Sequence, residues 1–212
     1  MRALYLTHPQ IRMDANVPVP LWPLSAEGRE RAERFAARGV VPKGAMIFSS
    51  RETKALELAE ILAQSVGTLV LSDHQMGEND RSSTGFLPPA LFELAADQFF
   101  AHPERSYEGW ERAVDAQARI VATVRTAMAC VPADTPAVFC GHGGVGTLLK
   151  CAIAGLPIHR REDQGRKGGP GGGNGFVFDF AAGAVLQDWT AMEELTADWV
   201  DAPMVAGTPV LT

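Results

Sequence analysis

The sequence of 212 residues contains few cysteines and no residue spacing typical of a metal site. Its three cysteines are an odd number, and Cys140 and Cys151 lie in apolar runs, so we expect buried free thiols. Neither a His-x-x-x-His nor a Cys-x-x-Cys pattern occurs. The sequence therefore predicts no metal centre.

A surplus of positive charge is also missing, because the formal net charge is −6. A general binder of nucleic acids or of anionic membranes needs a basic surface, so neither partner is expected. The apolar run Leu4–Leu6 near the N-terminus is too short for a signal peptide or a membrane span. We expect a cytoplasmic protein, and the charge balance still allows a local cationic pocket.

Short apolar runs alternate with helical patterns along most of the chain. With 46% hydrophobic and 21% charged residues, the chain can bury the core of a single domain covering residues 1–212. The predicted strands are Ala3–Thr7, Ala45–Ser49, Thr68–Ser72, Ala137–Gly141, Gly175–Phe180 and Ala184–Trp189. The predicted helices run from Ser25 to about Gly39, and over Glu52–Ser65, Pro89–Phe100, Gly109–Val131 and Val145–Ala154. This alternation predicts a three-layer α/β fold.

Two segments are predicted to be loops. Pro9–Pro23 is rich in proline and polar residues. His159–Asn174 is charged and then glycine-rich, which predicts a mobile loop. Its glycines lack the Gly-Lys-Ser/Thr and the following helix of a phosphate-binding loop.

Two histidines directly follow predicted strands. His8 comes after Ala3–Thr7, and His142 comes after Ala137–Gly141. Open α/β sheets bind ligands at the carboxyl ends of their strands, and parallel strands end at the same edge. The two histidines therefore predict one shared site.

The segment Gly141–Gly146 (GHGGVG) also fits the G-x-G-x-x-G pattern of dinucleotide-binding proteins. Three features weigh against that interpretation. The segment lies in the last third of the chain, and the pattern does not call for a histidine. Glu162 and Asp163 follow a charged stretch rather than the second strand that carries the ribose-binding carboxylate. Dinucleotide binding is thus the less favoured alternative.

Charged residues follow two further predicted strands. Arg51 and Lys54 lie at the start of a helix, where free amides and the helix dipole favour an anion, unless both cations simply face solvent. Glu78 and Asp80 lie in a turn and offer a carboxylate for acid–base chemistry, unless the turn is merely solvated. Together with the histidines, this set suits phosphoryl transfer to a neutral imidazole, with cations on the phosphoryl oxygens and an acid for the leaving oxygen.

Four segments, in this order, resemble the histidine phosphatase superfamily, the phosphoglycerate mutase-like proteins: Leu4–Pro9, Trp22–Arg29, Phe48–Ala63 and Gly141–Gly144. The resemblance spans nearly the whole chain and implies a three-layer α/β/α sandwich with a mostly parallel central sheet. It implies that His8 accepts the phosphoryl group and that His142 contacts it. It also implies that Glu78 is the proton donor, with Asp80 as its competitor.

The resemblance is imperfect at the predicted phosphate site. Thr7-His8-Pro9 replaces the family's Arg-His-Gly, which removes a bidentate arginine clamp and leaves only the hydroxyl of Thr7. Lys54 stands for the second arginine and keeps its charge without its fork. Gly143 and the cations Arg51 and Arg81 complete the predicted site.

The sequence thus predicts a phosphatase-type hydrolase that acts on a phosphate monoester through a phosphohistidine on His8. Its expected partner is a small phosphorylated substrate or inorganic phosphate, with no cofactor. Hydrolysis is favoured over mutase activity, because nothing in the sequence specifies how a phosphorylated intermediate would be retained and repositioned. The alternative within the family is a non-catalytic relative that binds phosphate or another anion.

Overall fold

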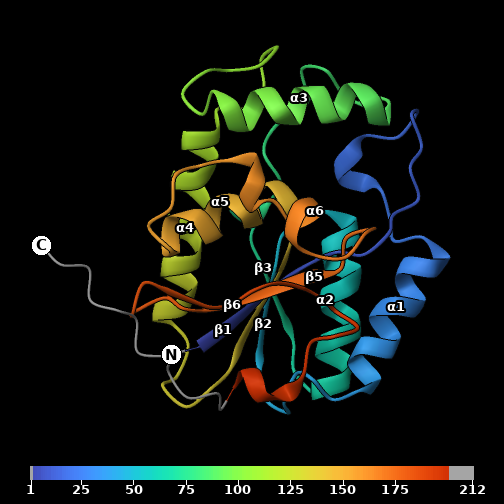
Figure 1. Ribbon diagram of the computed structural model, residues 1–212. Helices are drawn as coiled ribbons and strands as arrows, with labels where there is room; N and C mark the ends of the chain where they lie inside the picture. The colour runs from blue at the N-terminus through green and yellow to red at the C-terminus, as the bar shows by residue number, and fades with distance from the viewer. Residues whose placement is uncertain (1, 201–212) are drawn as a thin grey trace, which may run out of the picture.

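The computed structural model describes residues 2–200, and Figure 1 shows a mixed sheet between two layers of helices. Its six strands have the order β3-β2-β4-β1-β5-β6. Neighbouring strands are parallel from β3 to β1, whereas β5 is antiparallel to both β1 and β6. The strands are β1 (Arg2–Thr7), β2 (Met46–Ser49), β3 (Val70–Ser72), β4 (Ala137–Gly141), β5 (Asn174–Asp179) and β6 (Ala184–Ala191). The predicted α/β/α sandwich with a mostly parallel sheet is confirmed.

The helices are α1 (Ala26–Ala37), α2 (Thr53–Val66), α3 (Pro89–Ala101), α4 (Ala113–Ala129), α5 (Gly143–Ile153) and the short α6 (Gln164–Lys167). Short 3-10 segments are η1 (Val19–Leu21), η2 (His74–Met76), η3 (Arg160–Glu162) and η4 (Ala197–Trp199). No helix in the described range is both long and apolar enough to cross a membrane.

Two sequence predictions need correction. Helix α4 begins at Ala113 rather than at Gly109, because Glu108 and Gly109 have φ angles of 46° and 85°, which no right-handed helix contains. The segment 159–174 is not a plain loop, since it contains η3 and α6. Asp163 caps α6 by accepting a hydrogen bond from Gly165 N at 2.6 Å.

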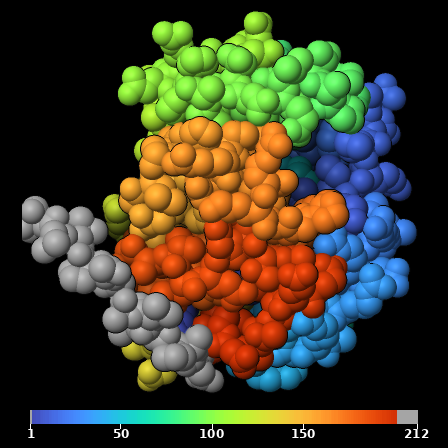
Figure 2. Space-filling model, in the orientation of Figure 1, coloured from blue at the N-terminus to red at the C-terminus, as the bar shows by residue number. Residues whose placement is uncertain are grey.

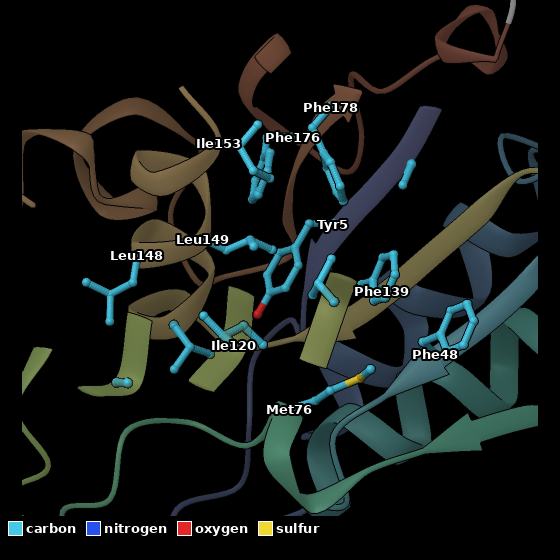
Figure 3. Close-up of a cluster of buried hydrophobic side chains, with 14 of the residues drawn as sticks. Tyr5, Phe48, Met76, Ile120, Phe139, Leu148, Leu149, Ile153, Phe176 and Phe178 are labelled. Carbon is cyan, nitrogen blue, oxygen red and sulfur yellow. The ribbon is translucent and has the colours of Figure 1, made fainter. Parts of the chain in front are cut away.

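Alternation along β1 divides the core into two parts. Ala3 and Tyr5 face a cluster shared with α3, α4 and α5, and Figure 3 shows Tyr5 among the side chains of this cluster. Leu4 and Leu6 face the opposite cluster, shared with α1 and α2. Successive side chains of a strand point to opposite faces, so β1 is covered on both sides.

The register of the two central strands brings the two histidines together. Strand β1 pairs with β4 so that Thr7 lies opposite Gly141, the last residue of each strand. Because the strands are parallel, both end at the same edge of the sheet. The next residues, His8 and His142, therefore leave the sheet side by side, and His8 N donates to Gly141 O at 3.0 Å.

Candidate active site

A cavity of about 530 Å³ opens at the carboxyl edge of the parallel strands. Figure 2 shows a hollow between α3, the segment that contains α6, and the N-terminal loop. Six of the predicted site residues line the cavity: His8, Lys54, Glu78, Arg81, His142 and Gly143. Thr7, Arg51 and Asp80 are not among its lining residues.

The ring of His8 is held by a hydrogen bond to the backbone and lies against the ring of His142. The ring centroids of His8 and His142 are 5.3 Å apart. Nδ1 of His8 is 2.9 Å from the carbonyl oxygen of Pro9, which can only accept, so we place the ring hydrogen on Nδ1 and the free lone pair on Nε2. Burial, together with nearby Lys54, lowers the pKa of His8 to about 4. The ring is therefore neutral at pH 7.

The ring of His142 offers a hydrogen-bond donor. Its Nε2 is 2.7 Å from Ser50 Oγ, and that hydroxyl accepts from Glu52 N at 3.1 Å. Since the Ser50 hydroxyl can then donate its own hydrogen to Nε2, we assign the ring hydrogen of His142 to Nδ1. Nδ1 is buried and has no hydrogen-bond partner among residues 2–200. Burial lowers the pKa of His142 to about 3, so this ring is also neutral at pH 7.

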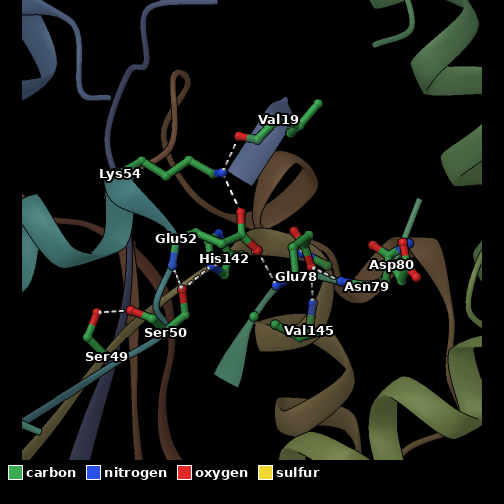
Figure 4. Close-up of polar contacts among 12 residues, drawn as sticks. Val19, Ser49, Ser50, Glu52, Lys54, Glu78, Asn79, Asp80, His142 and Val145 are labelled. Carbon is green, nitrogen blue, oxygen red and sulfur yellow. Dashed lines mark hydrogen bonds and ion pairs between the residues drawn. The ribbon is translucent and has the colours of Figure 1, made fainter. Parts of the chain in front are cut away.

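Glu52 belongs to the site although the sequence analysis gave it no role. One carboxylate oxygen accepts from Glu78 N at 2.8 Å and lies 3.5 Å from His142 Nε2, and the other pairs with Lys54 Nζ (Figure 4). Burial raises the pKa of Glu52, but His142 and Lys54 outweigh it and bring the pKa to about 2. The charge of Lys54, which also donates to Val19 O at 3.0 Å, is therefore offset by a carboxylate.

Glu78 lies at the N-terminus of α5, where its carboxylate accepts from Gly144 N at 3.0 Å and Val145 N at 2.8 Å (Figure 4). A Cβ at position 144 would lie 2.7 Å from Glu78 Oε1, so a larger residue there would displace this carboxylate. Burial raises the pKa of Glu78 against the hydrogen bond from Val145 N. Asp80 is exposed, and hydrogen bonds from Ser82 lower its pKa, so it carries a proton less often than Glu78 does.

The contacts of Glu78 also bear on the dinucleotide alternative. In dinucleotide-binding proteins the pyrophosphate occupies the amides at the start of the helix that follows the glycine pattern. Here the amides of Gly144 and Val145 are taken by the carboxylate of Glu78. A second anion at these amides would face that carboxylate directly.

Arg81 and Asn79 bring unpaired donors to the cavity. The guanidinium of Arg81 lies 4.7 Å from the ring centroid of Phe92, and no carboxylate of the described chain is within ion-pair distance of it. Asn79, which the sequence analysis did not single out, is 7% exposed, and its Nδ2 has no hydrogen-bond partner among the described residues. Arg51, by contrast, is exposed outside the cavity.

Thr7 does not reach the cavity. The glycine-rich segment 168–173 lies next to Thr7 and His8 and is hydrogen-bonded there. Thr7 is fully buried, and its Oγ1 is 2.7 Å from Gln164 Oε1 and accepts from Asn174 N at 3.0 Å. Gly173 N donates to His8 O at 3.0 Å. The predicted mobile loop is therefore hydrogen-bonded to the residue that carries the predicted nucleophile.

No group of three or more His, Cys, Asp and Glu residues that could hold a metal ion occurs in the part of the chain that the structure describes. The sequence profile of the histidine phosphatase superfamily (branch 1) matches residues 19–166. The fold and this match show that the chain belongs to the histidine phosphatase superfamily. No curated protein sequence matches the chain.

Solved structures of the same fold come from several bacteria. YhfR of Bacillus stearothermophilus has a TM-score of 0.72 and 18% identity, over 94% of this chain and 99% of that chain. The mycobacterial glucosyl-3-phosphoglycerate phosphatase, in its complex with inorganic phosphate, has a TM-score of 0.67 and 23% identity, over 89% and 93%. TTHB049 from Thermus thermophilus has a TM-score of 0.58 and 21% identity, over 89% and 99%. At these identities the likeness shows the shared fold.

Proposed function

We propose that this protein is a phosphatase that hydrolyses a phosphate monoester through a phosphohistidine on His8. The observation that carries the proposal is the pairing of two neutral imidazoles at one cavity. His8 has its Nε2 lone pair free because Nδ1 donates to Pro9 O, and His142 has an unpartnered Nδ1, which carries the ring hydrogen in the assigned tautomer. One ring is thus a nucleophile and the other a donor to the group under attack.

In the first step, Nε2 of His8 forms a bond to phosphorus while the bond from phosphorus to the leaving oxygen breaks. The leaving oxygen takes its proton from Glu78, whose raised pKa keeps more of the protonated form than an exposed carboxyl would have. In the second step, water attacks phosphorus and gives its proton to the Glu78 carboxylate as the bond to Nε2 breaks. His142, Arg81 and Lys54 bind the phosphoryl oxygens in both steps.

The walls of the cavity suggest the class of leaving group. Beyond the histidines, the lining includes Ile11, Trp22, Phe86 and Phe92. The rings of Trp22 and Phe86 meet edge to face with centroids 5.7 Å apart. An apolar wall of this kind favours a substrate whose leaving group carries an aromatic or aliphatic portion.

The free cysteines in addition support a cytoplasmic location.

A second candidate is a phosphate-binding protein without turnover. The observation that favours it is the pairing of Lys54 with Glu52, which offsets a cation in the cavity. A phosphoryl group in transfer carries negative charge, so a site with less positive charge stabilises the transition state less.

Hydrolysis of 1-naphthyl phosphate by wild type and His8→Ala tests the proposal. We expect the substitution to lower kcat/KM by about 100-fold or more, because no covalent intermediate can form. His74→Ala, at an exposed position in η2, is the matched control and should keep wild-type activity. Phosphate binding without turnover in wild type would favour the second candidate, and full activity in His8→Ala would refute the mechanism.

A further inference from the structure

The side-chain amide of Gln164 is oriented by the NH₂ group of Asn174, and its oxygen is also within reach of the Thr7 hydroxyl, which has a second acceptor in Asn174 O at 3.1 Å. Its Oε1 is 2.7 Å from Thr7 Oγ1 and 3.1 Å from Asn174 Nδ2. The amide of Asn174 is fixed in turn, because its Oδ1 accepts from Gly169 N at 2.7 Å and its Nδ2 donates to Gly169 O at 2.9 Å. An oxygen must therefore stand at the Oε1 position of Gln164, so the NH₂ group points away from this cluster.

The NH₂ group of Gln164 lies at the cavity, beside the start of α5. Gln164 is a lining residue, and a Cβ on Gly143 would lie 2.3 Å from its Nε2. Gly143 directly follows His142, so Nε2 lies beside the backbone one residue after the donor ring, at the same cavity. Among residues 2–200 no acceptor is hydrogen-bonded to Nε2. An oriented donor without a partner at a cavity wall is a binding group for an oxygen-rich ligand.

We propose that the amide of Gln164 binds the phosphoryl group, and that Thr7 positions this amide from behind. The inference rests on the proposed function for the nature of the ligand, a tetrahedral oxyanion. Thr7 is fully buried and stays out of reach of that ligand. Its hydroxyl acts through Gln164, which supplies a neutral hydrogen bond at the place where the sequence lacks an arginine.

The same cluster couples the amide to the nucleophile. Asn174 N donates to Thr7 Oγ1, and the preceding residue, Gly173, donates to the carbonyl of His8 at 3.0 Å. The glycine-rich segment 168–173 thus links the His8 backbone to the groups that orient Gln164. This arrangement fixes the donor and the nucleophile relative to each other.

Gln164→Glu tests the proposal, because it keeps the side-chain shape and the acceptor oxygen but replaces the NH₂ group by a second oxygen. We measure the dissociation constants of orthophosphate and orthovanadate by calorimetry, with thermal unfolding as the check on folding. Both constants are expected to rise at least ten-fold in Gln164→Glu. Gln98→Glu, the same charge change at an exposed position on α3, should leave them unchanged.

Thr7 separates positioning from mere stability. Thr7→Val removes the hydroxyl at similar volume and should weaken the binding of both anions several-fold. Thr7→Ser keeps a hydroxyl and should retain most of the wild-type affinity. Wild-type affinity in Gln164→Glu, or a wild type that binds neither anion, would overturn the inference. If wild type binds the anions through Gln164 but hydrolyses no ester, the proposed function fails and the inference stands. If His8-dependent hydrolysis occurs while Gln164→Glu binds normally, the reverse holds.

Discussion

Glu52 places a negative charge beside a site proposed to bind phosphate, so its removal should tighten phosphate binding. Its Oε1 is 3.5 Å from His142 Nε2, whereas the proposed anion binds at Nδ1, the other ring nitrogen. An oxyanion bound to Nδ1 lies roughly 8 Å from that carboxylate, and at an effective dielectric constant of about 20 the repulsion is about 2 kcal/mol per unit charge. Water in the open cavity and salt screen roughly half of it. We therefore expect Glu52→Gln to bind orthophosphate about five-fold more tightly, since 1.4 kcal/mol corresponds to a factor of ten.

Gln at position 52 keeps an oxygen that can accept from Glu78 N, so the turn before α3 keeps its anchor. The assay is calorimetric titration with orthophosphate at low and high salt, and the gain should shrink as salt rises. Glu60→Gln removes the same charge from an exposed position of α2 and should change little. Equal or weaker phosphate binding in Glu52→Gln would refute the electrostatic reasoning and show that the carboxylate serves mainly to hold its neighbours.

Three further predictions concern the acid, the pH dependence and the unpaired cation. Glu78→Gln should slow the hydrolysis of glycerol phosphate by about 100-fold or more. It should hardly affect the hydrolysis of 4-nitrophenyl phosphate, whose leaving group needs no proton. Equal losses of rate on both substrates would exclude Glu78 as the acid. In wild type, kcat/KM should rise with pH through about 4 as His8 loses its proton, and fall as Glu78 ionises above the ordinary glutamate pKa; the falling limb should vanish in Glu78→Gln. Arg81→Ala should weaken vanadate inhibition about ten-fold, as expected for the loss of one charge-assisted hydrogen bond. Arg125→Ala also removes an arginine that lies over an aromatic ring, and it should leave the inhibition unchanged. Unchanged inhibition in Arg81→Ala would place that cation outside the site.

The parts of the site that follow strand ends could be predicted from the sequence. His8 and His142 each end an apolar run, and the parallel pairing of β1 with β4 makes such ends neighbours. Glu78 could be placed in a turn after β3, although its contact with the start of α5 joins residues 67 positions apart. The alternation of apolar runs with helical patterns was sufficient to predict the three layers, because strands that are covered by helices on both faces form continuous apolar runs.

The parts that depend on the folded backbone rather than on a sequence pattern could not be predicted. Glu52 and Lys54 are two residues apart, a spacing that does not face two side chains toward each other within a helix. They meet because Glu52 precedes the first turn of α2 with extended backbone. Gln164 is 157 residues from Thr7, and only the folded chain brings them together. The glycine-rich composition around α6 predicted a loop instead of a helix, although Asp163 is a residue type that often caps helices.

The central claim is that His8 forms a covalent bond to phosphorus during turnover. The most direct measurement is to mix the protein briefly with a ³²P-labelled aryl phosphate, quench in alkali, in which phosphohistidine survives, and map the label by proteolysis. The account predicts a label on the peptide that contains His8, which is lost on brief exposure to acid and absent from His8→Ala. Sustained hydrolysis with no label on that peptide, or a label on another residue, would contradict it.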